Sequence, residues 1–385
     1  MVNYKIKKIS LLIVIITLDC LIAAGFAEVW IRLFIPTRNI CYLTDKDIGV
    51  RFCPNQKTWG HVEKNYKNEF ITNSLGFHDI EREIAKPENT YRIHIYGDSM
   101  VQGKALKIED TLSSLVERYF NSQSLNKKYE VVNMASGDDS TSNQIRTYEV
   151  IGTKFKPDLV VCYFMNNDFF DNVQSLHIKE YSPYHKIGEN DKLVYIPPVP
   201  KNHDSLWERF KQSSLLYRLI TNKLFESRFY NDLNVLKADI LSYLKHSRNN
   251  GDSNEALNYD EMVRTTIANE AWPLTLRLVK YFKEQVEGNG SKFLLVDGSG
   301  FENNPVGKTY SNKDLEEYCF ENEIDYIHVY EKYNEIFSHK DRGKYLLNDN
   351  HPTPYANREI ALFFAEKLEK FLMNNNKKIS MKINQ

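Results

Sequence analysis

The sequence predicts an α/β protein in which helices cover both faces of a parallel sheet. Short runs rich in β-branched and aromatic residues recur along the chain, and stretches with helical periodicity separate them. Alternation of this kind is typical of βαβ units, whose crossover helices bury the sheet. We expect strands at 92–97, 129–135, 158–165, 292–297 and 325–330, helices at 109–121, 140–154, 270–287 and 312–322, and a last helix at 355–373 before a polar, frayed tail.

The composition is that of a globular protein with an ample core. The chain has 385 residues, of which 42% are hydrophobic and 13% aromatic. A net charge of −1 gives no indication of nucleic-acid binding, so sugars or acyl groups are the better partners. The 24 tyrosines suit either sugar stacking or plain packing. Metal-ligand spacing is lacking, so we expect neither a metal nor a cofactor. Cys41 and Cys53 are placed where they could form a disulfide.

The N-terminus carries an apolar run at 9–27, preceded by Lys5, Lys7 and Lys8. About 20 apolar residues span a bilayer, and a basic flank predicts that the N-terminus stays in the cytoplasm. A cleaved signal peptide, with Gly25-Phe26-Ala27 as its cleavage site, is the alternative. The length of the run favours an uncleaved single-pass anchor. We therefore expect the globular part to lie outside the cytoplasm.

The strand expected at 92–97 runs into Gly97-Asp98-Ser99. This places a serine hydroxyl at the carboxyl end of a buried strand, where open α/β sheets bind and react. A lone Gly-Asp-Ser is usually just a turn, but Asp349 and His351 near the other end of the chain supply an acid and a base. A serine nucleophile needs such a base, and the base needs an orienting carboxylate. Ser99, His351 and Asp349 are therefore the candidate catalytic residues.

Two further strands end in residues that suit the same chemistry. One is followed by Gly137, and the other by Asn166-Asn167-Asp168. The oxyanion of an acyl transfer needs aimed hydrogen-bond donors, and the candidates are the backbone N–H groups of Ser99 and Gly137 and the side-chain amide of Asn167. Asp98 is expected to hold the turn by accepting backbone N–H groups.

These four blocks, in this order, resemble the SGNH (GDSL-type) hydrolases, whose roles fall on Ser99, Gly137, Asn167 and the Asp349/His351 pair. The resemblance covers roughly 91–170 and 292–368, and the segments 47–51 and 73–77 resemble membrane-anchored bacterial members. It implies a three-layer α/β/α sandwich with a mainly parallel, flavodoxin-like five-stranded sheet.

The chain is thereby divided into an anchor, a loop-rich prelude, a hydrolase domain with an insert, and a tail. Within the insert we expect a hairpin formed by 181–187 and 192–197, a helical stretch and a loop. The insert either roofs the active site or packs on the side of the sheet, and both readings stay open. The boundaries are 1–37 for the anchor, 38–90 for the prelude, 91–373 for the hydrolase domain with its insert at 171–270, 205–245 for the helical stretch, 247–259 for the loop, and 374–385 for the tail.

Two departures from the family pattern affect the functional reading. Met165 stands where the third block usually has glycine, so Asn166 competes with Asn167 for the oxyanion role. Asp349 lies two residues before His351, a spacing that resembles the alginate O-acetyltransferase-like branch. We expect an extracytoplasmic serine esterase that removes O-acyl groups, with O-acetyl as the expected group, from a glycan. The alternatives are an O-acyltransferase that works with a separate membrane donor protein, and a non-catalytic binding module.

Overall fold

The computed structural model describes residues 2–34, 40–62, 66–123, 127–174, 176, 181–199, 210, 214–217, 220, 266–300 and 310–383. The chain separates into two compact units. One comprises Met1–Asn39 with Lys201–Leu257, and the other comprises Ile40–Pro200 with Asn258–Gln385. The second unit holds every candidate site residue.

A five-stranded, all-parallel sheet forms the centre of the second unit, with the strand order β11-β10-β7-β5-β6. Numbered along the chain as five strands, this order is 5-4-3-1-2, which is the flavodoxin-like arrangement. All five predicted strands are confirmed: β5 (Thr90–Tyr96), β6 (Lys128–Asn133), β7 (Leu159–Phe164), β10 (Lys292–Asp297) and β11 (Tyr326–His328). The last is shorter than expected because α12 (Tyr330–Ser338), which the sequence analysis missed, begins two residues later.

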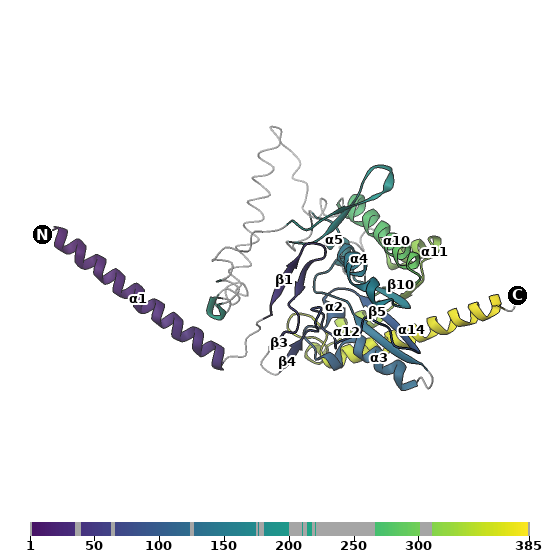
Figure 1. Ribbon diagram of the computed structural model, residues 1–385, viewed down its shortest axis with the longest axis horizontal. Helices are drawn as coiled ribbons and strands as arrows, with labels where there is room; N and C mark the ends of the chain where they lie inside the picture. The colour runs from purple at the N-terminus through teal and green to yellow at the C-terminus, as the bar shows by residue number, and fades with distance from the viewer. Residues whose placement is uncertain are drawn as a thin grey trace. The chain divides into compact units, whose positions relative to one another are not determined.

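Helices cover both faces of this sheet, which confirms the three-layer sandwich (Figure 1). The strands alternate strictly between the faces: Val160, Cys162 and Phe164 of β7 join one core cluster, and Leu159 and Val161 join the other. Two apolar faces need two covering layers. The first cluster is covered by α4 (Thr141–Val150), α10 (Trp272–Gly288) and α11 (Asn312–Glu321), and the second by α3 (Leu112–Gln123), α12 and α14 (Pro354–Ile383).

Short helical turns complete the second unit, and several of them shape the loops at the sheet edge. They are α2 (Ser99–Gln102), η1 (Ile108–Asp110), η2 (Gly152–Phe155), α5 (Asp168–Asp171), η3 (Glu189–Asp191), η4 (Ile267–Ala271) and α13 (Arg342–Tyr345).

The prelude contains two antiparallel hairpins, which the sequence analysis did not predict within this loop-rich segment. The strands of the first hairpin are β1 (Tyr42–Asp45) and β2 (Gly49–Phe52), and those of the second are β3 (Lys57–Val62) and β4 (Lys67–Ile71). Aromatic contacts across and between these short strands hold them: ring centroids lie 5.1 Å apart for Tyr42 and Phe52 and 4.8 Å apart for Phe52 and Phe70. A disulfide joins Cys41 to Cys53 beside the first hairpin.

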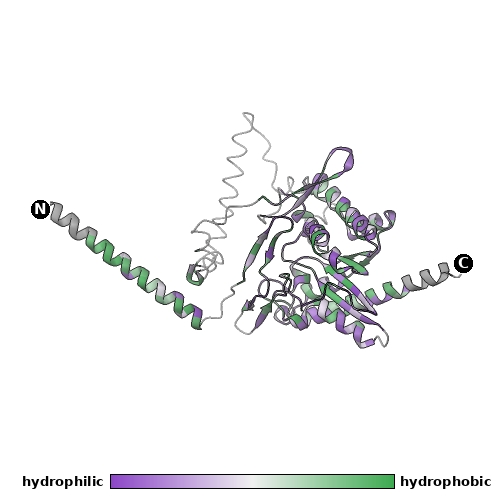
Figure 2. Ribbon diagram, in the orientation of Figure 1, coloured by the Kyte–Doolittle hydropathy of each residue, from purple (hydrophilic) through white to green (hydrophobic). Residues whose placement is uncertain are grey.

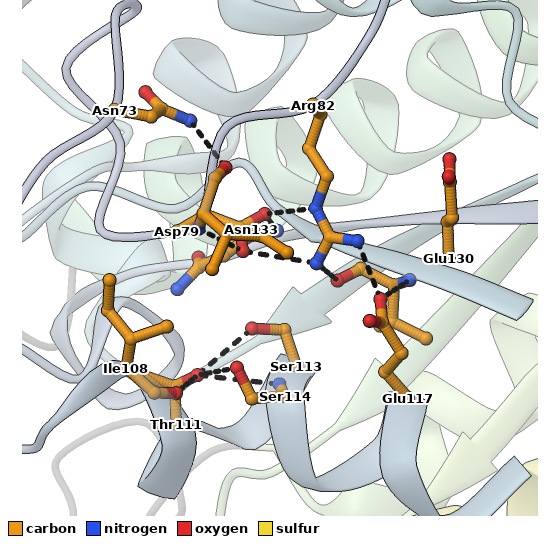
Figure 3. Close-up of polar contacts among 12 residues, drawn as sticks. Asn73, Asp79, Arg82, Ile108, Thr111, Ser113, Ser114, Glu117, Glu130 and Asn133 are labelled. Atoms are coloured by element: carbon orange, nitrogen blue, oxygen red, sulfur yellow. Dashed lines mark hydrogen bonds and ion pairs between the residues drawn. The ribbon is translucent and has the colours of Figure 1, made fainter. Parts of the chain in front are cut away.

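A buried ion-pair network ties the prelude to the sheet (Figure 3). Arg82 contacts Asp79 at 3.2 Å and Glu117 of α3 at 2.8 Å. The Asp79 carboxylate also accepts the backbone N–H of Asn133 at 3.1 Å, at the end of the edge strand β6. The prelude is thus joined to the domain by buried charges and is part of its packed structure.

The predicted hairpin of the insert is confirmed as β8 (Tyr184–Ile187) and β9 (Leu193–Ile196). It packs on the helical layer, where His185 Nδ1 lies 3.1 Å from Ser142 Oγ of α4 and Arg146 stacks on the Tyr195 ring. Of the two alternatives for the insert, the structure supports packing on the side of the sheet for this hairpin. The stretches expected at 205–245 and 247–259 lie outside the described residues, apart from 210, 214–217 and 220.

The N-terminal helix α1 (Val2–Phe34) contains a 24-residue segment, Leu11–Phe34, which is long and apolar enough to cross a membrane. Figure 2 shows apolar residues along most of this helix. A membrane anchor and a signal sequence both have this length and composition.

The last helix continues further than predicted. We expected the polar tail from 374 to fray, whereas α14 remains helical to Ile383. The physical reason is that residues 374–383 contain neither glycine nor proline to end the helix.

Candidate active site

The turn after β5 presents Ser99 at the carboxyl end of an inner strand of the sheet. Ser99 is the first residue of the one-turn helix α2, and it is partly exposed. Asp98 caps this helix by accepting the backbone N–H of Met100 at 2.8 Å, as expected from the sequence. Gly97 allows the end of β5 to pack closely against Val101 of α2, because a Cβ at position 97 would lie 2.7 Å from Val101 Cγ2.

The other end of α2 is held by Asn133, the last residue of β6. Its buried side-chain amide approaches the carbonyl oxygens of Val101 and Gln102 at 3.3 Å each. Its side-chain oxygen accepts the N–H of Ala135 at 3.1 Å. Sequence reasoning missed this residue, because a single asparagine after a strand carries no signal beyond that of a turn.

Gly137 lies beside the nucleophile helix. A Cβ on this glycine would come within 3.3 Å of the side-chain oxygen of Gln102, in α2. The loop after β6 therefore runs directly against the segment that carries Ser99. The next residue, Asp138, has a left-handed φ of 58°, so the loop turns sharply at this point.

Asn167 follows the end of β7, and its side chain lies near Asp98, the residue before Ser99. Its amide donates to Asp171 Oδ2 at 2.9 Å, and its side chain lies near enough to the carboxyl group of Asp98 to oppose the rise in the pKa of that group. The amide therefore lies near two acidic side chains, one of which directly precedes Ser99. Sequence reasoning missed Asp171, which lies four residues further along the chain and shares this contact.

Asp168 anchors the turn that carries Asn167. The buried carboxyl group of Asp168 accepts the N–H of Met165 at 2.9 Å and bonds with Thr141 and Gln144 at 3.1 and 3.2 Å. Burial raises the pKa of Asp168 well above its ordinary value. Met165, which replaces the usual glycine, is absent from the described residues with positive φ, so the turn does not require glycine here.

Asp349 and His351 share a tight turn immediately before α14. Leu347 N–H donates to the His351 carbonyl at 2.8 Å, and Asn350 takes a left-handed φ of 64°, which asparagine tolerates well. His351 Nδ1 lies 3.1 Å from Asp349 Oδ1, an ion-pair contact that falls short of a well-aligned hydrogen bond. The two-residue spacing therefore still places the carboxylate beside the imidazole.

The second carboxylate oxygen of Asp349 faces another histidine. His61 Nδ1, in β3 of the prelude, lies 3.5 Å from Asp349 Oδ2, and the His61 side chain is only 3% exposed. Burial opposes the ionisation of Asp349, but its close contacts with the His351 and His61 rings outweigh it and hold the pKa of Asp349 far below its usual range. The sequence analysis missed His61, because the surrounding prelude has no motif that would single it out.

The carboxyl group of Asp98 connects these segments. Burial raises the pKa of Asp98, while the donors Met100 N–H and Asn167 and the nearby His351 ring act in the opposite direction. His351 and Asn167 therefore both act on the carboxyl group of the residue that precedes Ser99. Gly137 lies against Gln102 of α2, and Asp349 lies beside His351. A serine hydroxyl, an imidazole and an ionised carboxylate are together the components of nucleophilic acyl transfer.

The described part of the chain contains no group of three or more His, Cys, Asp and Glu side chains that could hold a metal ion.

Comparison with known proteins gives structural neighbours only. No family model and no curated protein matches the chain. A psychrotrophic esterase, EstA, from Pseudoalteromonas sp. is similar with a TM-score of 0.37 and 11% identity, over 74% of this chain and 99% of the esterase. A lipase/acylhydrolase from Enterococcus faecalis gives 0.36 and 11%, over 73% of this chain and 96% of the other.

An acetylxylan esterase, Axe2, from Geobacillus stearothermophilus gives a TM-score of 0.37 and 12% identity, over 72% of this chain and 93% of the esterase. All three of these scores and identities are low.

Proposed function

We propose that this protein is an extracytoplasmic serine esterase that removes O-acyl groups, most simply O-acetyl, from a glycan. One observation carries the proposal. The His351 ring, paired with an ionised Asp349, acts electrostatically on the Asp98 carboxyl group, which directly precedes Ser99 at the carboxyl end of a strand of the parallel sheet. An acid–histidine pair whose field reaches the residue before a strand-end serine supports a catalytic role for these groups better than a purely structural one.

The reaction follows from the roles of these groups. His351 takes the proton of the Ser99 hydroxyl, and the serine oxygen attacks the acyl carbonyl carbon. The N–H groups of Ser99 and Gly137 and the Asn167 amide stabilise the resulting oxyanion. The sugar alcohol leaves with the proton from His351, and the acyl group stays on Ser99. A water molecule, deprotonated by His351, then releases the carboxylic acid and restores the serine.

The location is proposed from the N-terminal helix. An uncleaved anchor at 9–31, with its basic flank in the cytoplasm, would place the second unit outside the cytoplasm, where cell-surface and secreted glycans are found. A binding module without catalysis is a weaker candidate, because such a module does not need an Asp/His pair beside the serine.

An O-acyltransferase is the second candidate, favoured by the Asp-x-His spacing and the apolar helix. The two reactions share every step up to the acyl-enzyme and differ in whether His351 activates water or a sugar hydroxyl. A transferase would receive its acyl group from a separate membrane protein.

The purified protein without its anchor, given an activated acetyl ester with and without a sugar acceptor, distinguishes the candidates. The esterase proposal expects free acetate at a rate indifferent to the sugar, and the Ser99→Ala variant should show none of it. Acetylated sugar formed at the expense of acetate would instead indicate a transferase. Ester turnover that survives unchanged in a folded Ser99→Ala variant would reject both enzymes.

A further inference from the structure

We propose that His61, in the second prelude hairpin, is a positioning residue that holds the catalytic carboxylate of Asp349 in place for His351. The proposal rests on the function argued above and extends the active site beyond the hydrolase blocks. It makes the prelude a working part of the enzyme.

The geometry assigns one carboxylate oxygen to each histidine. Asp349 Oδ1 lies 3.1 Å from His351 Nδ1, and Asp349 Oδ2 lies 3.5 Å from His61 Nδ1. The His61 side chain is 3% exposed and that of Asp349 36% exposed, so the contact is shielded on the histidine side. A carboxylate fixed at one oxygen by a buried N–H cannot rotate freely, and its other oxygen stays directed at the catalytic imidazole.

The separation of 3.5 Å is longer than an ideal hydrogen bond. In enzymes such contacts are often long before substrate binds and shorten in the reacting complex. His61 would donate through Nδ1, so the proton on its neutral ring belongs on that nitrogen.

A β-bulge directs His61 toward this site. In the β3–β4 pairing, Trp59 lies opposite Glu69 and His61 opposite Asn68, so Gly60 is an extra residue. Inserting one residue turns the following side chain to the opposite face of the strand, and bulges of this kind are common beside active sites. Trp59 stays partly exposed, while His61 is buried.

The same hairpin is fastened to the chain just after the nucleophile helix. The Asn68 amide donates to the carbonyls of Lys104 and Leu106 at 3.0 and 2.8 Å, and the Tyr66 hydroxyl donates to the Ala105 carbonyl at 2.8 Å. A Cβ on Gly60 would lie 2.1 Å from the Lys104 carbonyl oxygen, so only glycine allows this approach. The hairpin thus connects the segment that follows Ser99 with the carboxylate behind His351.

Three variants of the full-length protein test the proposal by steady-state kinetics on an activated acetyl ester. His61→Leu keeps the buried volume but removes the N–H, and kcat should fall roughly 10- to 100-fold with KM unchanged. His61→Asn places an amide N–H near the position of Nδ1, and it should recover most of kcat. In the Asp349→Asn background, adding His61→Leu should change kcat by less than about twofold, because both changes remove the same interaction.

A matched control separates this role from general damage to the prelude. His78 is also buried, and its ring nitrogens face the carbonyls of Ile71 and Leu106 instead of a catalytic group. His78→Leu should lower thermal stability, yet leave kcat per active site near the wild-type value once sites are counted by titration with a serine-reactive phosphonate.

Several results would overturn the proposal. They are wild-type kcat in folded His61→Leu, an equal loss in His61→Leu and His61→Asn at equal stability, or an additive loss in the double variant. The proposed esterase function fails separately, if wild-type protein shows no Ser99-dependent turnover. Loss of turnover in Ser99→Ala together with an unaffected His61→Leu would reject only the role of His61.

Discussion

At the residue scale, the amide of Asn167 illustrates how a predicted donor is held ready. In the structure its side chain donates to Asp171 and lies near the carboxyl group of Asp98, which directly precedes Ser99. An amide nitrogen carries two N–H donors, so one can stay on Asp171 while the other donates to an oxyanion. Charge developing on the substrate oxygen would compete for the donor only in the transition state, which is where catalysis needs it.

This arrangement gives a prediction for the two neighbouring asparagines. Asn167→Ala should lower kcat by roughly 10²–10³ with a small effect on KM, because it removes a donor to the oxyanion. Asn166→Ala, at the adjacent partly exposed position, is the matched control and should stay within a few-fold of wild type. Steady-state kinetics on an activated ester measures both. A damaged Asn166 variant beside a mild Asn167 variant would show that the register chosen from the sequence is wrong.

Sequence reasoning could name residues that lie in motif blocks, and it failed for residues whose importance comes from tertiary contact. Ser99, Asp349 and His351 stand out because strand ends and an acid/base pair are visible locally. His61 and Asn133 do not, since each acts on a segment distant in sequence, Asp349 in one case and α2 in the other. Their roles depend on how the prelude and β6 pack, which no local pattern records.

At the element scale, strand alternation predicted the sheet well and the prelude poorly. The buried strands β7 and β10 are largely apolar runs, because both of their faces are covered, whereas β5 alternates apolar residues with Arg92 and His94. The strands of the prelude hairpins have four to six residues and mixed polarity, and contacts such as Phe52 with Phe70 hold them. Aromatic contacts between hairpins are invisible in a local pattern.

The ion pair that joins the prelude to the sheet gives a prediction of its own. Arg82→Met should lower the free energy of unfolding by about 3–5 kcal/mol at pH 7, because it leaves the buried Asp79 carboxylate without its cation. Urea unfolding of the second unit measures this change. Ester turnover should fall as well, since the same prelude carries His61.

The pH dependence of that loss has a definite sign. Burial already raises the pKa of Asp79, with Arg82 opposing the shift, so removing Arg82 raises this pKa further above that of the unfolded chain. A raised carboxyl pKa favours the folded state when the group is protonated and costs stability as pH rises through the folded value. The difference between variant and wild type should therefore shrink as pH is lowered from 7 toward 5. A difference that is constant or grows over this range would contradict the account.

At the scale of the whole molecule, the two units divide the proposed tasks of attachment and chemistry. The apolar helix belongs to one unit, and the parallel sheet with its site belongs to the other. An apolar run and a Gly-Asp-Ser block are both visible locally, so the sequence could separate an anchor from a catalytic domain. The sequence analysis assigned the whole insert to the hydrolase domain, whereas Lys201–Leu257 belongs to the first unit. The reaction that follows the acyl-enzyme depends on the acceptor, which no residue pattern specifies.

The anchor gives a prediction that needs no knowledge of the substrate. Residues 9–31 should remain attached, with the basic flank in the cytoplasm and Ser99 outside. Protease added to spheroplasts should then degrade the second unit while cytoplasmic markers survive. N-terminal sequencing that starts near Glu28 would show instead that the segment is a cleaved signal peptide.

The central claim is that Ser99 is a nucleophile activated by His351, and covalent labelling tests it most directly. Purified protein is treated with a fluorophosphonate, and the modified peptide is identified by mass spectrometry. The account predicts a single adduct on Ser99, formed at a rate that falls by several orders of magnitude in His351→Ala. An adduct on another serine, or labelling of Ser99 at the same rate without His351, would contradict it.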